Sequence, residues 1–181
     1  ETVNGSIRVV NYHKNMGKGE AFRYGFTQSR GDPVFLMDCD LAIPSETLEK
    51  FLENLKTVDI VVGSKRHPSS TIKNWALHRR ILSKGANLLI RVFMKVNVAD
   101  TQGGMKLFKR SVLINVLPKL NIRRYAFDVE LLHYASLENY ILSEMPLTLT
   151  HTIGHVSPGE VLRFVKDITS LMIRSRPANK R

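Results

Sequence analysis

The sequence of 181 residues contains a single cysteine, Cys39, and is short of acidic side chains, with 16 aspartates and glutamates against 27 lysines and arginines. One cysteine excludes a disulfide framework within the chain and fits a reducing compartment. The chain also lacks an apolar run long enough to cross a bilayer, and its first residues do not resemble a signal peptide. We therefore expect a cytoplasmic protein.

Several signatures of catalysis are missing as well. The six histidines do not have the spacing of a zinc site. Neither the Gly-x4-Gly-Lys-Ser/Thr pattern of a P-loop nor a Gly-x-Ser-x-Gly nucleophile elbow is present, and Cys39 has no obvious base beside it. Nucleophilic catalysis by a side chain is therefore not indicated.

Positive charge is what the chain has in excess, with a formal net charge of +11. Such a charge predicts attraction to polyanions, namely nucleic acid, an anionic membrane surface or phosphorylated substrates. The length and the ordinary hydrophobic content of 43% suit a single domain, which we expect to span residues 1–173. Residues 174–181 form a basic C-terminal tail, for which a solvated terminus is the simplest interpretation.

Strands and helices alternate in the first third of the chain. Apolar runs predict strands over residues 7–10, 34–37 and 59–63, and helical spacing predicts one helix over residues 20–29 and another that Ser45 would cap. This alternation is typical of α/β proteins with a mostly parallel sheet flanked by helices. Further along, we expect helices over residues 75–96, 111–117, 128–137 and 160–173, a strand over 105–108 and an extended segment over 141–150.

The strand over residues 34–37 ends in two carboxylates, Asp38 and Asp40. Residues i and i+2 of a strand share a face, so both side chains can point to one place beyond its carboxyl end, where open α/β sheets bind ligands. Mg²⁺ and Mn²⁺ take one or two such carboxylates and complete their shell with water and substrate phosphates. A polar loop without a metal is the alternative.

Two basic segments adjoin predicted strands. Asn15, Gly17 and Lys18 lie in a turn before a helix, where an anion would be favoured, although an ordinary turn is the simpler interpretation. Lys65 and Arg66 follow the third strand at the same sheet edge as the aspartates. They are either phosphate ligands or solvated charges.

Two further segments hold candidate residues. Gln102 lies in a loop with Gly103 and Gly104, whose paired glycines suggest a close approach of backbone to the chain or to a ligand. Asp128 opens a predicted helix, where capping is the simpler role and a contact with substrate is the alternative.

Together these segments resemble the family 2 glycosyltransferases, which have the nucleotide-sugar-binding architecture called GT-A. Within that family they resemble the polyprenyl-phosphate branch, the dolichyl-phosphate glucosyltransferases and mannose synthases. The pattern Asp-Thr-Gln-x-Gly-x-Lys-Leu-Phe, followed by Phe-Asp-Val-Glu-Leu-Leu, favours the glucosyltransferase side. The matching segments are residues 15–21, 31–32, 37–41, 62–66, 100–108 and 127–132.

The chain departs from this family at its beginning. A strand with Pro-x-x-Asn-Glu and a second strand ending in Asp-Asp-Gly-Ser normally precede the turn over residues 15–19, and neither is present. The resemblance therefore implies a GT-A-like (Rossmann-like) fold that is N-terminally incomplete by two strand–helix units, and the chain alone could be inactive. Cys39 stands where the family usually has alanine.

The resemblance implies an inverting transfer of a hexose from a nucleotide diphosphate sugar, UDP-glucose or GDP-mannose, to a polyprenyl phosphate. It implies Mg²⁺ or Mn²⁺ at Asp38 and Asp40 and catalytic roles for Asp128 and Gln102. Donor contacts would come from Asn15, Gly17, Lys18, Lys65 and Arg66.

The acceptor is itself a phosphate with a second pKa of about 6, so it needs no strong general base. Arg79, Arg80 and Ser83, on the basic half of the helix over residues 75–96, are candidates for holding it. The apolar half of that helix would lie along the lipid or the membrane surface, or would be ordinary core. With such an acceptor we expect a cytoplasmic protein in peripheral contact with the membrane surface.

Two alternatives belong to other classes. The charge also suits a nucleic-acid-binding module, but the sequence has no aromatic-rich sheet motif, basic region with heptads or zinc finger, so we expect no nucleic-acid partner. The other alternative is a non-catalytic part of a split transferase.

Overall fold

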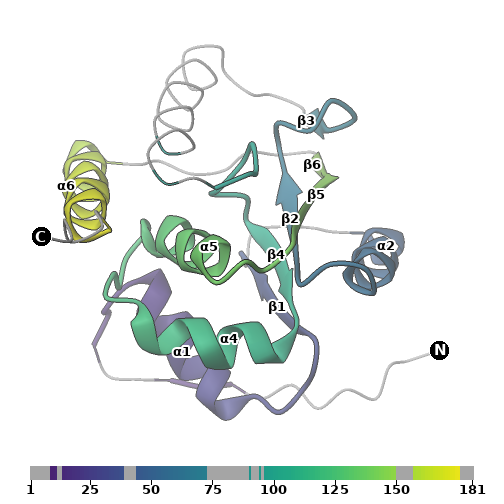
Figure 1. The fold of residues 1–181 in the computed structure, drawn as a ribbon, viewed down its shortest axis with the longest axis horizontal. Coiled ribbons are helices and arrows are strands. Elements are labelled where there is room, and N and C mark those ends of the chain that lie inside the picture. Colours follow the sequence, from purple (N-terminus) through teal and green to yellow (C-terminus); the bar gives the residue numbers. More distant parts are fainter. Residues whose placement is uncertain are drawn as a thin grey trace, which may run out of the picture.

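The computed structural model describes residues 9–11, 14–38, 44–72, 90, 94, 96–149 and 157–175. Its main sheet has four strands in the order β1-β4-β2-β5 (Figure 1). These strands are β1 (Val34–Met37), β2 (Ile60–Ser64), β4 (Met105–Phe108) and β5 (Leu142–Pro146). A second, two-stranded sheet pairs β3 (Thr71–Ile72) with β6 (Thr148–Leu149).

The direction of the strands fixes where a site can form. β4 is antiparallel to both β1 and β2, and β2 is parallel to β5, so β1, β2 and β5 run in one direction and only β4 is reversed. The carboxyl ends of β1 and β2 therefore meet at one edge of the sheet. The loop before β4 enters at that edge, because Met105 pairs with Met37.

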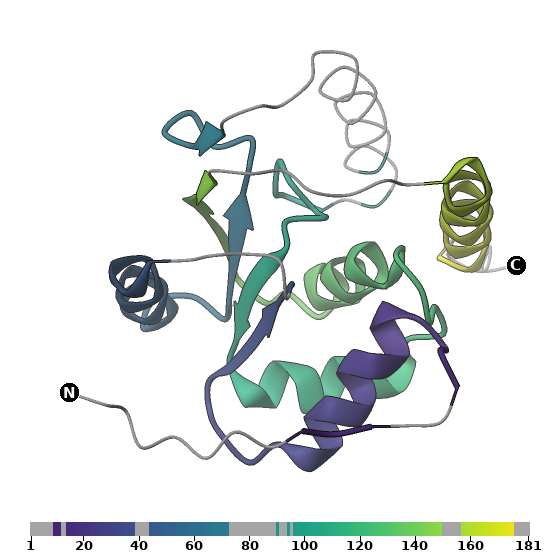
Figure 2. The same cartoon turned by 180° about the vertical axis from the view of Figure 1, so that it is seen from behind.

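Helices cover both faces of the sheet. α1 (Lys18–Gln28), α4 (Arg110–Val116) and α5 (Phe127–Leu137) lie on one side, and α2 (Ser45–Leu55) lies on the other, as the opposite views of Figures 1 and 2 show. The alternation of side chains along β2 matches this arrangement, since Ile60 and Val62 belong to the core under α4 and α5 and Val61 to the core under α2. Two further helical segments are the 3₁₀ turn η1 (Leu117–Lys119) and α6 (Pro158–Arg174).

The helices and strands predicted between residues 20 and 63 and between residues 105 and 173 are confirmed, with shifts of one or two residues at their ends. α1 begins at Lys18, two residues earlier than predicted, and α6 begins at Pro158 because Ser157 and Glu160 form a capping box that the sequence analysis did not use. Arg174, the first residue of the predicted tail, is the last residue of α6.

Two local predictions are wrong. Val9 and Val10 are not in a strand and are exposed, because none of the described strands pairs with them. Ser45 is the first residue of α2 and not its cap; Pro44 takes the cap position, and no side chain caps the helix there.

The helix predicted over residues 75–96 lies mostly outside the described residues. Ile90 and Met94 are helical and buried, whereas Val96 is buried but not helical. No helix in the described part of the chain is both long enough and apolar enough to cross a membrane.

Candidate functional site

Asp38 lies directly beyond β1, at the edge where the strands end. Its backbone N–H donates to the carbonyl oxygen of Gly104 (2.8 Å), which ties the end of β1 to the loop before β4. Its carboxylate is partly exposed. Asp40, the second predicted metal ligand, lies outside the described residues, so the sharing of one face by the two carboxylates stays a prediction.

The turn that holds Asn15, Gly17 and Lys18 is built around a glycine. Gly17 has a φ of 103°, and a Cβ on it would lie 2.7 Å from the carbonyl oxygen of Arg123, so any other residue is excluded by both conformation and space. The Oδ1 atom of Asn15 accepts the N–H of Gly17 (3.0 Å). The turn thus packs against residues 123–124 and directs Lys18, the first residue of α1, towards the sheet.

Lys18 joins two carboxylates that are far apart in the sequence. Its Nζ atom lies 3.0 Å from Oδ1 of Asp38 and 2.8 Å from Oδ2 of Asp128. Burial by itself lowers the pKa of Lys18, but the two carboxylates outweigh it and raise that pKa. Lys18 is therefore a fixed cation at the edge of the sheet.

Asp128 does not cap α5; Ala126 does, and Asp128 lies in the first turn. The expectation of a capping role is therefore wrong. The carboxylate is buried and its Oδ1 atom lies 2.8 Å from Nζ of Lys106, which also donates to the carbonyl oxygen of Gly103 (2.6 Å). Burial alone would raise the pKa of Asp128, yet Lys106 and Lys18 hold that pKa below its usual range. Burial also lowers the pKa of Lys106, and the Asp128 carboxylate offsets this in part.

The loop over residues 100–104 is anchored by Asp100, which the sequence analysis noted only as part of a motif. Its Oδ2 atom accepts the backbone N–H of Lys65 (3.0 Å), and its Oδ1 atom accepts that of Gln102 (3.2 Å). A Cβ on Gly103 would lie 1.9 Å from the carbonyl oxygen of Gly63, so this loop rests directly on β2. The side chain of Gln102 is exposed at this edge.

Lys65 and Arg66 follow β2 at the same edge, as predicted, and both are half-buried. Burial lowers the pKa of Arg66, and the carboxylates of Asp100 and Glu144 oppose that shift. The structure thus brings Lys18, Asp38, the loop over residues 100–104 and the end of β2 to one place. The predicted acceptor ligands, Arg79, Arg80 and Ser83, lie outside the described residues.

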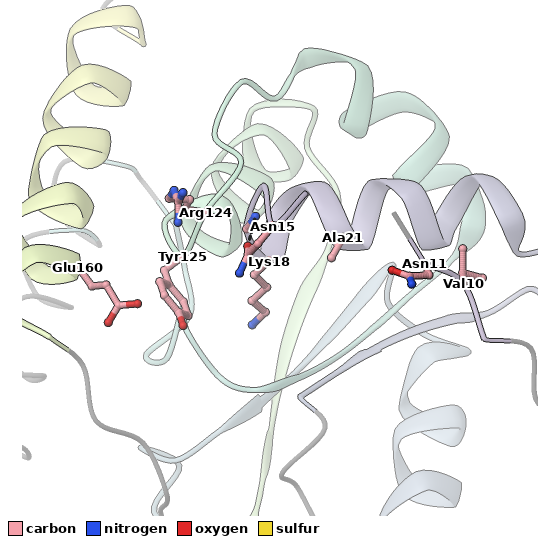
Figure 3. A pocket seen from close by; sticks show the side chains of 9 residues that line it. Val10, Asn11, Asn15, Lys18, Ala21, Arg124, Tyr125 and Glu160 are labelled. Carbon is pink, nitrogen blue, oxygen red and sulfur yellow. Dashed lines mark hydrogen bonds between the residues drawn. The ribbon is translucent and has the colours of Figure 1, made fainter. Parts of the chain in front are cut away.

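A cavity of about 460 Å³ lies beside the first turn of α1. Asn15 and Lys18 line it together with Arg124 and Tyr125, which precede α5, and with Glu160 of α6. These side chains are drawn in Figure 3. The sequence analysis did not single out Arg124 and Tyr125. Their position just before the Phe-Asp-Val-Glu motif could have marked them as candidate site residues.

A divalent metal is compatible with the residues at this edge. Asp38 offers a partly exposed carboxylate, a hard oxygen ligand of the kind that Mg²⁺ and Mn²⁺ prefer. Within the described ranges no group of three or more His, Cys, Asp or Glu side chains is placed to hold a metal. Such an ion would therefore depend on Asp38, Asp40 and the oxygens of a substrate.

Comparison with known proteins gives a consistent result. The sequence matches the family model described as Glycosyl transferase family 2 over residues 2–117. It is 36% identical over 148 residues to a dolichyl-phosphate beta-glucosyltransferase of Trichomonas vaginalis, covering 78% of this chain and 44% of the relative. It is 34% identical over 178 residues to the dolichyl-phosphate beta-glucosyltransferase of Homo sapiens, covering 93% and 55%. The chain thus spans about half the length of the curated relatives it matches.

The fold is similar to that of glucosyl-3-phosphoglycerate synthase from Mycobacterium tuberculosis, whose crystal structure contains Mn²⁺, UDP-glucose and phosphoglyceric acid. The TM-score is 0.62 at 14% identity, over 87% of this chain and 54% of that one. This likeness shows the fold, and with it the expected GT-A-like α/β class is confirmed.

Proposed function

The chain belongs to glycosyl transferase family 2, and from this premise we propose that it is the catalytic part of an inverting glucosyltransferase that uses dolichyl phosphate as acceptor. The names of its relatives from Trichomonas vaginalis and Homo sapiens support the sugar and the acceptor. The observation that carries the proposal is the convergence of Lys18, Asp38 and the Asp100 loop at the carboxyl edge of β1 and β2.

The donor in this proposal is UDP-glucose, in preference to GDP-mannose. A protein of the same fold binds UDP-glucose together with Mn²⁺. The positive side chains at the sheet edge, Lys18, Lys65 and Arg66, suit a diphosphate, and the turn with Asn15 and Gly17 completes the proposed donor site.

We assign the metal, Mg²⁺ or Mn²⁺, to Asp38 and Asp40. When bound, such an ion neutralises charge on the diphosphate as a Lewis acid. The Lys18 ammonium already lies on Oδ1 of Asp38 and adds a second positive charge at the same place. Because Asp38 is partly exposed, its carboxylate is open to an ion from solvent.

The reaction needs little acid–base chemistry from the protein. An oxygen of the acceptor phosphate attacks the anomeric carbon from the side opposite the diphosphate; the new C–O bond forms as the bond to the diphosphate breaks, so the configuration inverts. At neutral pH the acceptor phosphate, with a second pKa of about 6, is already largely dianionic. In the proposal Arg79, Arg80 and Ser83 hold that phosphate, and the exposed Gln102 contacts the reacting groups.

A contact with the membrane surface is part of the proposal, because the acceptor is a lipid. α6 exposes Leu162 (72%), Val165 (53%) and Ile173 (65%), whose spacing puts them on one side of the helix. Arg163 and Lys166 lie on the same helix and are exposed. An apolar stripe with basic neighbours is typical of helices that lie in an anionic membrane surface. We propose the cytoplasmic side, since the single cysteine fits a reducing compartment.

The test uses the full-length protein with dolichyl phosphate and radiolabelled sugar nucleotides. We expect transfer of glucose from UDP-glucose into the lipid phase in the presence of Mn²⁺ or Mg²⁺. GDP-mannose is the control donor, and we expect much less transfer of mannose from it. If neither sugar nucleotide supports transfer, and neither raises the Tm of the protein with either metal, the proposed function is wrong.

A further inference from the structure

Four charged side chains of alternating sign form a row that runs from the core to the edge of the sheet. Their order is Lys106, Asp128, Lys18 and Asp38, and neighbouring charges lie 2.8, 2.8 and 3.0 Å apart. Their side chains are 0%, 3%, 20% and 39% exposed in the same order. The charges therefore balance, and exposure to solvent rises from the core to the edge of the sheet.

Both oxygens of the inner carboxylate are paired with cations. Oδ1 of Asp128 lies on the ammonium of Lys106 and Oδ2 lies on that of Lys18, both at 2.8 Å. A general base must come within hydrogen-bonding reach of the proton it removes. In this geometry the Lys18 ammonium lies between Asp128 and the exposed edge of the sheet, so we expect Asp128 to act on the reaction through Lys18.

Of the two lysines, Lys18 is the one that can reach a substrate, because Lys106 is completely buried. An ammonium group has three N–H donors and no acceptor. Asp38 and Asp128 account for two of them, which fixes the direction of the third. Lys18 also lines the cavity beside α1, and its side chain is 20% exposed.

Lys106 ties Asp128 to the loop before β4. It is completely buried, and it donates to the carbonyl oxygen of Gly103 as well as to Asp128. The same loop accepts the backbone N–H of Asp38 through Gly104. Lys106 therefore links Asp128, which binds Lys18, to the loop that holds the end of β1.

We infer that Asp128 is a positioning residue: supported by Lys106, it holds the Lys18 ammonium beside Asp38 so that the third N–H of Lys18 donates to the departing diphosphate. This inference rests on the proposed function and gives Asp128 a different part from direct contact with substrate. Charge on the diphosphate grows as its bond to the sugar breaks, so the contact strengthens in the transition state and acts mainly on kcat.

A double-mutant cycle tests the inference in the full-length protein with UDP-glucose, dolichyl phosphate and Mn²⁺. Lys18→Met and Asp128→Asn should each lower kcat by roughly 10- to 100-fold, the range for one hydrogen bond to a charged group, with a smaller change in KM. The double variant should be no slower than the slower single variant. Lys18→Arg should recover part of the activity, and Lys119→Met, which removes a surface ion pair with Glu138, should leave kcat unchanged.

A second measurement covers the case in which Asp128→Asn does not fold. Lys18→Met keeps the buried Asp128–Lys106 pair, and loss of the Lys18 cation raises the pKa of Asp128. If Asp128 were the base, the acid limb of the kcat profile would move to higher pH in Lys18→Met. We expect kcat to fall by the same factor across the pH range, with the limb unmoved.

The outcomes separate the two claims. Losses that multiply in the double variant, or an acid limb that moves, overturn the positioning role while the active wild-type protein upholds the proposed function. A wild-type protein that transfers no glucose overturns the proposed function, and the positioning role with it.

Discussion

The Nζ atom of Lys106 lies 2.8 Å from Oδ1 of Asp128, and both side chains are buried in the core. Removal of one partner leaves an unpaired charge out of water, which costs roughly 3–5 kcal/mol. We predict that Lys106→Met lowers the free energy of unfolding in urea by that amount. Lys119→Met is the matched control, because its partner Glu138 is exposed and such pairs contribute about 0–1 kcal/mol. Equal effects of the two substitutions would contradict this account of the pair.

The contact of Gly103 with β2 leads to a second prediction. A Cβ on Gly103 would overlap the carbonyl oxygen of Gly63, so Gly103→Ala should destabilise the protein by about 1–3 kcal/mol or more and displace the loop. A Cβ on Gly25, within α1, would meet nothing within 4 Å. Gly25→Ala should therefore stabilise the protein by about 0.5–1 kcal/mol through helix propensity. Thermal unfolding of the two variants measures both changes in stability. A Gly103→Ala variant as stable as wild type would refute the close packing.

The third prediction concerns the contribution of Asp59 to stability at low pH. Burial alone would raise the pKa of Asp59, but the N–H of Ile141 and the Lys109 ammonium hold that pKa below its usual range. Because the folded pKa is the lower one, the carboxylate stabilises the protein above the unfolded pKa of about 3.8, and this contribution is lost as the pH falls through the folded pKa. The stability difference between wild type and Asp59→Asn should thus be constant near neutral pH and shrink below about pH 4. Denaturation in urea at several pH values measures it; a difference that grows in acid would have the wrong sign.

The exposed stripe of α6 gives a prediction on membranes. Substitution of both Leu162 and Ile173 by glutamate should lower the fraction of protein that sediments with vesicles of phosphatidylcholine and phosphatidylserine. The reason is that the substitutions put negative charge into the apolar stripe. Ile114→Glu serves as the control, since Ile114 is similarly exposed on α4, away from α6. An equal loss of binding in the control, or none in the α6 variant, would remove α6 from the proposed contact.

Local patterns predicted the elements of this fold well. The apolar run over residues 34–37 and the helical spacing in α2 were sufficient, because burial in a sheet or against one side of a helix leaves a pattern in the sequence. Val9 and Val10 form a similar run, but a strand also needs a partner, and local sequence does not say whether one is present.

The contacts of the site could not be predicted in the same way. Lys106 alternates with apolar neighbours and looks like a solvent-facing residue of a strand, yet it is fully buried because α5 covers that face and supplies Asp128. Lys18 and Asp128 are more than a hundred positions apart, and their contact depends on how α1 and α5 pack. The resemblance to a family placed these residues in motifs, but only the fold shows which side chains touch.

Glucosyl transfer by the full-length protein, measured for wild type, Asp38→Asn and Asp40→Asn, decides whether these two carboxylates hold a metal that the reaction needs. We expect wild type to transfer glucose from UDP-glucose to dolichyl phosphate with Mn²⁺ and to stop when the metal is chelated. Both variants should unfold at the wild-type Tm but transfer only at background level. Undiminished transfer by both variants, or by wild type without metal, would contradict this expectation.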